Sequence, residues 1–371
     1  MRTRVYGALV ATLVVGLLAG CHTSPTTDMD PAAESEQAIQ GGDIDTHDAF
    51  AVGILDRQTS VLCSGALIAP NLVLTARHCV SEISHEAVRC ATDTFGKDRD
   101  PGSLWITVDA RLQNTATSSF YRGKKLFVPT DAKLCGNDIA VIELDASVPD
   151  TVPLVTPAIA RPLTDSAYYA RSIAAIGYGS TSPAGMGAGT RRIRENIAIA
   201  CIPGDAKLGC PRDDQLRASE FVTADGTCQG DSGSSAYDQR SYDARVPLTL
   251  GVLSRGGSDR DADRCIGAVY TRVDAFRDLL VGAALEAARD GKYTPPSWTS
   301  TPPFDASWFD GGDINGASGF VGTNASSGSL DDSGCAAGGR APRAWDDLAA
   351  LAGMIALVVT AGKLRSSRRR R

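Results

Sequence analysis

The sequence predicts an all-β fold made of many short strands, and three observations support this prediction. Aromatic residues form 6% of the 371-residue chain and there are 38 glycines, a composition that suits strands separated by turns. No long helical heptad pattern is present. All-β units commonly reach about 200 to 250 residues as one domain, so the length does not require several. The net charge of −6 offers no case for nucleic acid as a partner.

Residues 1–20 have the composition of an export signal. Arg2 and Arg4 precede an apolar run from about Ala8 to Leu18, which indicates a signal peptide rather than a membrane span. The run ends in Leu-Ala-Gly-Cys, which resembles a bacterial lipobox and implies cleavage before Cys21 and lipidation of its thiol. An ordinary signal peptide with a chance cysteine is the alternative. One acylated terminus would hold the chain on a membrane surface without spanning it.

The folded region is expected to begin after a polar, flexible linker over residues 21–38. Turn residues then separate strand-like runs at short intervals. The first group of runs comprises Ala51–Leu55, Val61–Ile68, Leu104–Leu112 and Ala140–Leu144. A proline-rich stretch over 150–163 leads to a second group, which comprises a run from about Ile173, Gly251–Ser254 and Ala268–Val273. Apolar residues at helical spacing predict a helix within Asp274–Arg289.

The stretch GTCQGDSGSS, from Gly226 to Ser235, carries the strongest chemical signal in the chain. A serine such as Ser232 is a poor nucleophile until a base takes its proton and N–H donors stabilise the negative charge created on the substrate. Gly230 has no side chain, so its N–H and that of Ser232 can face a substrate carbonyl. These are the requirements of acyl transfer, and they predict a histidine elsewhere with an acid that orients it.

Only one of the four histidines has a suitable setting. His78 stands in LIAPNLVLTARHCV, at the end of a strand-like run and beside Cys79. The others are His22, in the leader, and His47 and His85, which have no special setting. An acid follows in CGNDIAVIELD, where Asp138 opens an apolar run typical of a buried strand.

The order His78, Asp138, Ser232 gives the chain a resemblance to the trypsin/chymotrypsin-like serine proteases, from Ile39 to about Asp290. The resemblance implies one domain over 39–290, with two six-stranded antiparallel β-barrels and a C-terminal helix. It also implies a serine endopeptidase that acts on peptides or proteins through an acyl-enzyme. His78 would be the base, Asp138 would orient it, and the N–H groups of Gly230 and Ser232 would form the oxyanion hole. No metal or cofactor is required.

Eight of the ten cysteines lie in the protease-like region, an even number that suits disulfides in an exported protein. Spacing alone does not determine their connectivity. The resemblance implies Cys63 with Cys79, which would staple the loop of His78, and Cys228 with Cys265, which would join the walls of the specificity pocket. The remaining pairs are proposed as Cys90 with Cys135 and Cys201 with Cys210. The alternative is a zinc site of His78, Cys79, His85 and Cys90, whose spacing matches no familiar ligand pair.

The sequence Ile39-Gln40-Gly41-Gly42 is similar to the IVGG at which zymogens of this family are cut. In the family the freed α-amino group pairs with the aspartate before the nucleophile, here Asp231, and so sets the Gly230 N–H in place. A buried carboxylate needs such a partner. The alternative is that Ile39 is only the first strand residue. A cut after Ala38 would also release the chain from Cys21 and its lipid, and an activating protease other than a trypsin is expected because Ala38 is not basic.

The specificity pocket is expected to be open and uncharged. The family position at its base corresponds to Gly226, and its walls correspond to Gly256 and Ala268. These small residues favour an apolar, small-to-medium P1 residue, alanine included, which would permit self-cleavage after Ala38. The alternative is that Asp225 turns into the pocket and restores a preference for basic residues, at the cost of burying an unpaired charge.

Three positions depart from the family pattern. Arg77 replaces the alanine before the histidine, Ser234-Ser235 replaces Gly-Pro, and Arg255 stands where the family often has tryptophan. None of them removes a triad group or an oxyanion donor. The backbone groups of Ser254 and Gly256 remain available for pairing with an extended substrate.

The C-terminal part differs in composition from the protease-like region. Residues 291–340 are rich in Gly, Ser, Pro and Asp and are expected to form a disordered stalk. Within 341–371, the apolar run Leu348–Gly362 is short for a membrane span and is followed by SSRRRR. With Gly334-Cys335, these features resemble the MYXO-CTERM class of bacterial sorting tail, and a plain tail anchor is the alternative. We therefore expect an exported protein, held by its termini at the outer membrane or cell surface and released by processing.

Two other functions are alternatives to the endopeptidase. A catalytically inactive surface binding module could use the same fold, but such modules usually lose a triad member, and all three are present. An esterase fits less well, because GDSGSS is not a GxSxG elbow and the acid precedes the serine in the chain.

Overall fold

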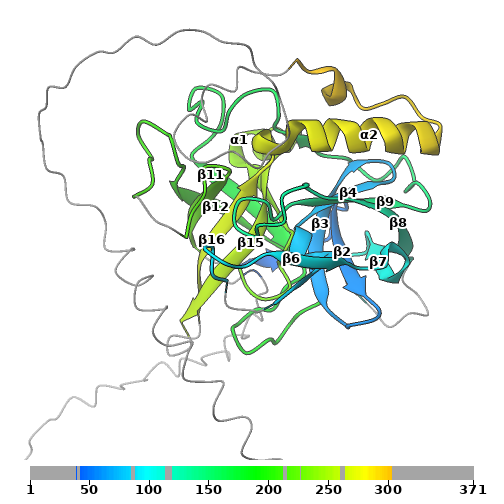
Figure 1. Ribbon diagram of the computed structural model, residues 1–371, viewed down its shortest axis with the longest axis horizontal. Helices are drawn as coiled ribbons and strands as arrows, with labels where there is room; N and C mark the ends of the chain where they lie inside the picture. Colours follow the sequence, from blue (N-terminus) through cyan, green and yellow to red (C-terminus); the bar gives the residue numbers. More distant parts are fainter. Residues whose placement is uncertain are drawn as a thin grey trace, which may run out of the picture. The chain divides into compact units, whose positions relative to one another are not determined.

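The computed structural model describes residues 39, 42–84, 88–112, 119–211, 215–225, 227–259 and 264–302. The expected export signal, Cys21, the expected linker, the greater part of the expected stalk and the expected sorting tail lie outside these residues. Within them, two closed six-stranded barrels and a C-terminal helix confirm the predicted fold class (Figure 1). No helix in the described part of the chain is long and apolar enough to cross a membrane.

The first barrel is a closed ring of antiparallel strands. In order around the ring they are β2 (Ala51–Asp56), β3 (Leu62–Ala69), β4 (Leu72–Thr75), β9 (Ala140–Leu144), β8 (Tyr121–Phe127) and β7 (Leu104–Thr107). Buried side chains such as Val52, Leu67 and Ile142 fill its interior. The run expected over Leu104–Leu112 ends as a strand at Thr107, where the Thr107 hydroxyl oxygen accepts a hydrogen bond from the Asp109 N–H at 3.1 Å and turns the chain.

The second barrel also closes on itself, because its two end strands pair with each other. In order they are β12 (Arg192–Cys201), β11 (Ser172–Gly177), β14 (Ser235–Asp238), β15 (Leu248–Asp259), β16 (Arg264–Arg272) and β13 (Glu220–Asp225). Two short strands join its edges: β1 (Asp43–Ile44) pairs antiparallel with β12, and β10 (Thr156–Pro157) pairs parallel with β15.

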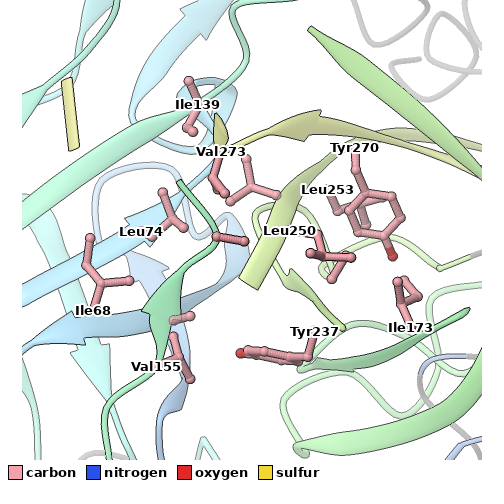
Figure 2. Close-up of a cluster of buried hydrophobic side chains, with 14 of the residues drawn as sticks. Ile68, Leu74, Ile139, Val155, Ile173, Tyr237, Leu250, Leu253, Tyr270 and Val273 are labelled. Carbon is pink, nitrogen blue, oxygen red and sulfur yellow. The ribbon is translucent and has the colours of Figure 1, made fainter. Parts of the chain in front are cut away.

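One continuous hydrophobic core joins the two barrels. Figure 2 shows Ile68 and Leu74, from strands of the first barrel, close to Val155, with Ile173, Leu250 and Tyr270 of the second barrel in the same cluster. All six of these side chains are at most 1% exposed. Burial of this apolar surface stabilises the contact between the barrels. The shared core therefore keeps the facing ends of the two barrels in a fixed position relative to each other.

The C-terminal helix α2 (Arg277–Gly291) packs against β4 and β9 of the first barrel (Figure 1). The expected helix began three residues earlier, but Asp274–Phe276 forms a 3-10 turn instead. The chain beyond α2 is also folded, although the stalk was expected from residue 291. Trp298, in the 3-10 turn Ser297–Ser300, is 6% exposed and its indole N–H donates to the Ile68 carbonyl at 3.3 Å. Tyr293 is a second anchor, since its hydroxyl donates to Asn71 Oδ1 at 2.7 Å, and the two aromatic residues extend the folded region past the expected boundary.

The remaining elements are short. They are the 3-10 turns Arg77–Cys79 and Pro101–Ser103, the hairpin of β5 (Ser81–Ile83) and β6 (Phe95–Asp98), and helix α1 (Gln239–Asp243). The turn at Arg77–Cys79 follows β4 directly and carries His78.

Candidate active site

His78 and Asp138 meet because of the pairing between β4 and β9. Thr75, the last residue of β4, lies opposite Ala140, the first residue of β9. In an antiparallel pair, the chain that leaves one strand lies beside the chain that enters the other. The His78 N–H donates to Asp138 Oδ1 at 2.9 Å, and His78 Nδ1 lies 2.7 Å from Asp138 Oδ2. Since an ionised carboxylate only accepts, Nδ1 carries the proton and Nε2 of the neutral ring is an acceptor.

The same contact shifts the pKa values of both groups. Burial alone lowers the pKa of His78, but the negative charge of Asp138 and the hydrogen bond to it outweigh burial and raise that pKa above its usual 6.5. Burial alone raises the pKa of Asp138, but His78 and the Ser254 hydroxyl lower it below its usual 3.8. Arg99 opposes the protonation of His78 to a smaller extent. Asp138 is therefore ionised at neutral pH.

Ser232 lies in the turn between β13 and β14, which is anchored on both barrels. Its carbonyl accepts from the Ser64 N–H of β3 at 2.8 Å, and the Gly233 N–H donates to the Leu253 carbonyl of β15 at 2.8 Å. The Ser232 carbonyl oxygen also lies 3.6 Å from the sulfur of Cys79, the residue after His78. The serine and the histidine are thus brought together from separate barrels.

The backbone N–H groups of this turn differ in whether they donate to a group of the protein. Those of Asp231, Gly233 and Ser234 donate to backbone carbonyls of the protein. Those of Gly230 and Ser232 donate to no group among the residues that the structure describes. Gly230 has a φ of +93°, and its Cβ position would lie 2.9 Å from Gly179 Cα, so a side chain there would be strained and crowded. Two unused donors beside Ser232 match the requirement for an oxyanion hole.

Asp231 is fully buried and is held by backbone N–H groups. The Gly179 N–H donates to its Oδ1 at 2.7 Å and the Cys228 N–H to its Oδ2 at 3.0 Å. The N–H of Ile39, which is 0% exposed, donates to the same carboxyl in the uncut chain. Burial raises the pKa of Asp231 to about 7, although these hydrogen bonds and Arg192 oppose the shift. Ile39 and Asp231 therefore lie together.

The residues expected around the specificity pocket are partly described. Gly256 of β15 and Ala268 of β16 are direct partners across the two strands. The Cβ position at Gly256 would lie 2.9 Å from the Gly267 carbonyl oxygen, so the site accepts no larger residue without movement. Gly226 and the side chain of Asp225 lie outside what the structure describes.

The three departures from the family pattern have different surroundings. The Arg77 side chain is buried, and its Nη1 donates to the carbonyls of Pro129 and Asp131 at 2.9 and 2.8 Å, so a loop holds its end. Ser234 and Ser235 are both 0% exposed. The guanidinium of Arg255 binds a carboxylate, that of Glu220.

Two contacts of the site were not predicted from the sequence. The Ser254 hydroxyl donates to Asp138, whereas we assigned Ser254 only a backbone role. Glu220 was not singled out at all, although it pairs with Arg255. No local pattern around Glu220 signals this pairing, because its partner lies 35 residues away in the chain.

The structure contains the four disulfides that we expected. They are Cys63–Cys79, Cys90–Cys135, Cys201–Cys210 and Cys228–Cys265. The first joins β3 to the turn that carries His78. The alternative zinc site would need the thiolates of Cys79 and Cys90, and both sulfurs are in disulfides.

The comparisons with known proteins agree on one family. The model of the Trypsin family matches residues 39–280. The chain is 25% identical to a trypsin from Saccharopolyspora erythraea, over 66% of this chain and 96% of that protein. It is 27% identical to a trypsin-like protease from Streptomyces glaucescens, over 61% of this chain and 75% of that protein. Brachyurin from Leptuca pugilator is 26% identical, over 59% and 85% respectively.

Proposed function

The chain belongs to the trypsin family, and from this premise we propose that it is a serine endopeptidase with Ser232, His78 and Asp138 as its catalytic triad. Family membership supports a serine protease in general. One observation supports the specific residues: the 2.7 Å contact of His78 Nδ1 with buried Asp138, which leaves Nε2 as the proton acceptor. The substrates are peptides or proteins.

In the proposed reaction, His78 Nε2 accepts the Ser232 hydroxyl proton while Oγ attacks the carbonyl carbon of the peptide. The carbonyl oxygen becomes negative and is stabilised by the N–H groups of Gly230 and Ser232, each worth about 3 kcal/mol. The C–N bond then breaks, and His78 gives its proton to the leaving amine. Water releases the acyl group by the same route, and Asp138 stabilises the imidazolium in each half.

We propose an uncharged specificity pocket. The small residues Gly256 and Ala268 face each other across β15 and β16, and Gly226 would form the base. An apolar, small-to-medium P1 residue fits such a pocket. A preference for arginine or lysine would mean instead that Asp225 turns inward.

We propose that a cut after Ala38 activates the protein. The new α-ammonium of Ile39 would replace an amide N–H beside Asp231 and would neutralise a carboxylate that burial disfavours. Because Ile39 is buried in the uncut chain, the activating protease, or another copy of the enzyme, has to bind a conformation in which this residue has moved out. The same cut would separate the domain from a lipid at Cys21.

The location of the protein is proposed from its terminal sequences. The lipobox-like sequence at Cys21 and the sorting-like tail with Cys335 both favour export and attachment at the outer membrane or cell surface. Mass spectrometry of the membrane fraction tests this: a diacylglyceryl adduct on Cys21 supports lipidation, and a soluble mature chain without it contradicts lipidation.

The test of the enzyme activity uses protein that lacks Cys21 and has been cut before Ile39. A fluorophosphonate probe should label it, and Ser232→Ala should abolish labelling. A peptide library varied at P1 should be cleaved after small or medium apolar residues. Gly204→Ala is a control, since an added Cβ at Gly204 meets no atom within 4 Å.

Two outcomes would contradict the proposal. No labelling in spite of an Ile39 terminus would mean that the site is inactive, and the chain would then be a binding module on this fold. Labelling that persists in Ser232→Ala would place the nucleophile elsewhere. For self-activation, processing of isolated Ser232→Ala at Ile39 would exclude the protein as its own activator.

A further inference from the structure

A buried carboxylate, that of Glu220, connects three segments around the candidate active site. Its side chain is 0% exposed. Oε1 accepts from the Gly136 N–H at 2.9 Å and Oε2 from the Arg217 N–H at 2.8 Å. Arg255 adds two further hydrogen bonds, from Nη1 to Oε1 at 2.6 Å and from Nη2 to Oε2 at 3.0 Å. One residue at the start of β13 thus holds the loop before β9, the chain before β13 and strand β15.

Glu220 is attached to the loop that carries Asp138 and to the segment that carries its hydroxyl donor, Ser254. Gly136 stands two residues before Asp138, and its N–H is one of the four donors. Arg255 directly follows Ser254, whose hydroxyl donates to the Asp138 carboxylate. The Ser219 hydroxyl, next to Glu220 in the chain, also donates to the Gly136 carbonyl at 2.8 Å. A shift of Glu220 would therefore move Asp138 through its backbone and through its hydroxyl donor.

We propose that Glu220 and Arg255 form a positioning pair, which fixes the Asp138 loop relative to the Ser254–Gly256 edge of β15 and thereby holds the Asp138–His78 contact in its working geometry. Among the described residues, neither member of the pair contacts Ser232, so both residues act through Asp138 and His78. The effect on activity rests on the proposed function, whereas the effect on the His78–Asp138 contact does not.

The chemistry of the Glu220–Arg255 pair favours a positioning role over a purely electrostatic one. A buried carboxylate without a cationic partner is strongly unfavourable, so Glu220 requires Arg255 or a substitute. The planar guanidinium binds both carboxylate oxygens at once and so fixes direction as well as distance, which a lysine ammonium does not. Displacement of a catalytic group by about 1 Å can lower a rate by roughly 100-fold. A rigid, two-point contact is therefore useful next to the acid of a triad.

The chain offers a matched control in Asp205. This carboxylate is also buried, and it accepts backbone N–H groups from Lys207 at 2.7 Å and Leu208 at 2.8 Å. Arg171 binds it at 2.6 Å. Asp205 thus has the same kinds of partners as Glu220, but none of them contacts His78, Asp138 or Ser254 in the described part of the chain. A loss of general stability should be similar for both carboxylates.

The experiment compares the wild-type protein, cut before Ile39, with Glu220→Gln, Arg255→Met, Arg255→Lys and Asp205→Asn prepared in the same way. The terminus at Ile39 is verified, the active sites are titrated, and kcat and KM are measured from pH 5 to 9. The His78 ring is titrated separately by NMR. We expect kcat to fall at least about tenfold in Glu220→Gln and Arg255→Met, and the His78 pKa to move down toward its usual value. For Arg255→Lys, kcat and the His78 pKa should lie between those of these two variants and those of wild type. Asp205→Asn should lower Tm and leave kcat and the His78 pKa unchanged.

The outcomes separate this proposal from the proposed function. If wild type neither labels nor cleaves, the endopeptidase proposal fails, and the NMR titration of His78 still decides whether the pair positions Asp138. If Glu220→Gln and Arg255→Met keep both the wild-type pH profile and the wild-type His78 titration, the positioning pair is overturned, whatever their Tm. A fall in kcat of the same size in Asp205→Asn would also overturn it, since the effect would then follow stability alone.

Discussion

The contact between His78 and Asp138 determines how activity should depend on pH. Only the neutral imidazole can accept the Ser232 proton, and Asp138 raises the pKa of His78. Activity should therefore be lost as pH falls through a value above 6.5, which the acid limb of kcat/KM reports. In Asp138→Asn we expect this limb to move to lower pH and kcat to fall by about 10⁴-fold. An acid limb that is the same in wild type and Asp138→Asn would contradict the assignment.

Gly233, next to Ser232, allows the turn to approach the first barrel. Its φ is +79°, and an added Cβ would lie 2.1 Å from Thr75 Oγ1 and 2.5 Å from the Ser64 carbonyl oxygen. We expect Gly233→Ala to lose probe labelling and about 3 kcal/mol or more of unfolding free energy, because backbone has to move. Gly204→Ala is the matched control: its φ is +80° and the site is open, so about 1 kcal/mol is expected. Equal losses in both variants, measured by chemical denaturation, would exclude the steric explanation.

Part of this site could be predicted from sequence because its residues lie in short local motifs. His78, Asp138 and Ser232 each stand in a characteristic run of neighbours. The Glu220–Arg255 pair and the Ser254 hydroxyl could not be predicted, because their partners come from segments that are distant in the chain. Arg77 looked like a change in the site, but its side chain is directed to the carbonyls of Pro129 and Asp131. Side-chain direction depends on tertiary packing and is not encoded by the residue type.

Helix α2 is held on the first barrel by a buried acid. Glu143 of β9 is 0% exposed, and its partner Lys124 also binds Asp290 of α2, both at 2.7 Å. Lys124→Met should leave Glu143 buried without its cation and destabilise the protein by about 2 kcal/mol, a value reduced because Lys124 is half-exposed. Lys125→Met is the control, since its pair with Glu286 on the same helix is exposed and should contribute less than about 1 kcal/mol. Equal changes in Tm for the two variants would contradict this role.

The mainly apolar strands were easier to predict than the charged ones. β2 and β9 are mainly apolar, and their expected bounds agree with the structure to within one residue. β8 and β12 are longer, but they carry several charged residues and were not expected. The two-residue strands β1 and β10 and helix α1 were not expected, because elements so short depend on the strands they join. Residues 292–301 are held on the core by Trp298 and Tyr293, although the composition of this segment indicates disorder.

At the scale of the whole molecule, a cut before Ile39 should change how stability depends on pH. Burial gives Asp231 a pKa of about 7 in the uncut chain, against 3.8 when exposed. The folded uncut chain thus binds an extra proton between about pH 4 and 7, and its stability should fall as pH rises through this window. In the cut chain, an α-ammonium beside Asp231 should favour the ionised form of Asp231 and so remove this fall in stability.

The measurement uses Ser232→Ala protein, so that self-digestion does not interfere. Unfolding free energies of the cut and uncut forms are compared from pH 4 to 8. Asp231→Asn in the uncut chain should abolish the same slope. If cut and uncut proteins lose stability in parallel over this range, Ile39 and Asp231 do not pair as proposed.

The division of the site between two barrels affects when activity can arise. His78 and Asp138 belong to the first barrel, whereas Ser232 and the amides beside it belong to the second. Synthesis proceeds from the N-terminus, so the first barrel can be complete before the second has been made. With the proposed mechanism, a half-folded or shortened chain holds only part of the chemistry and cannot cleave its neighbours. The architecture is thereby a safeguard against self-digestion among newly made molecules.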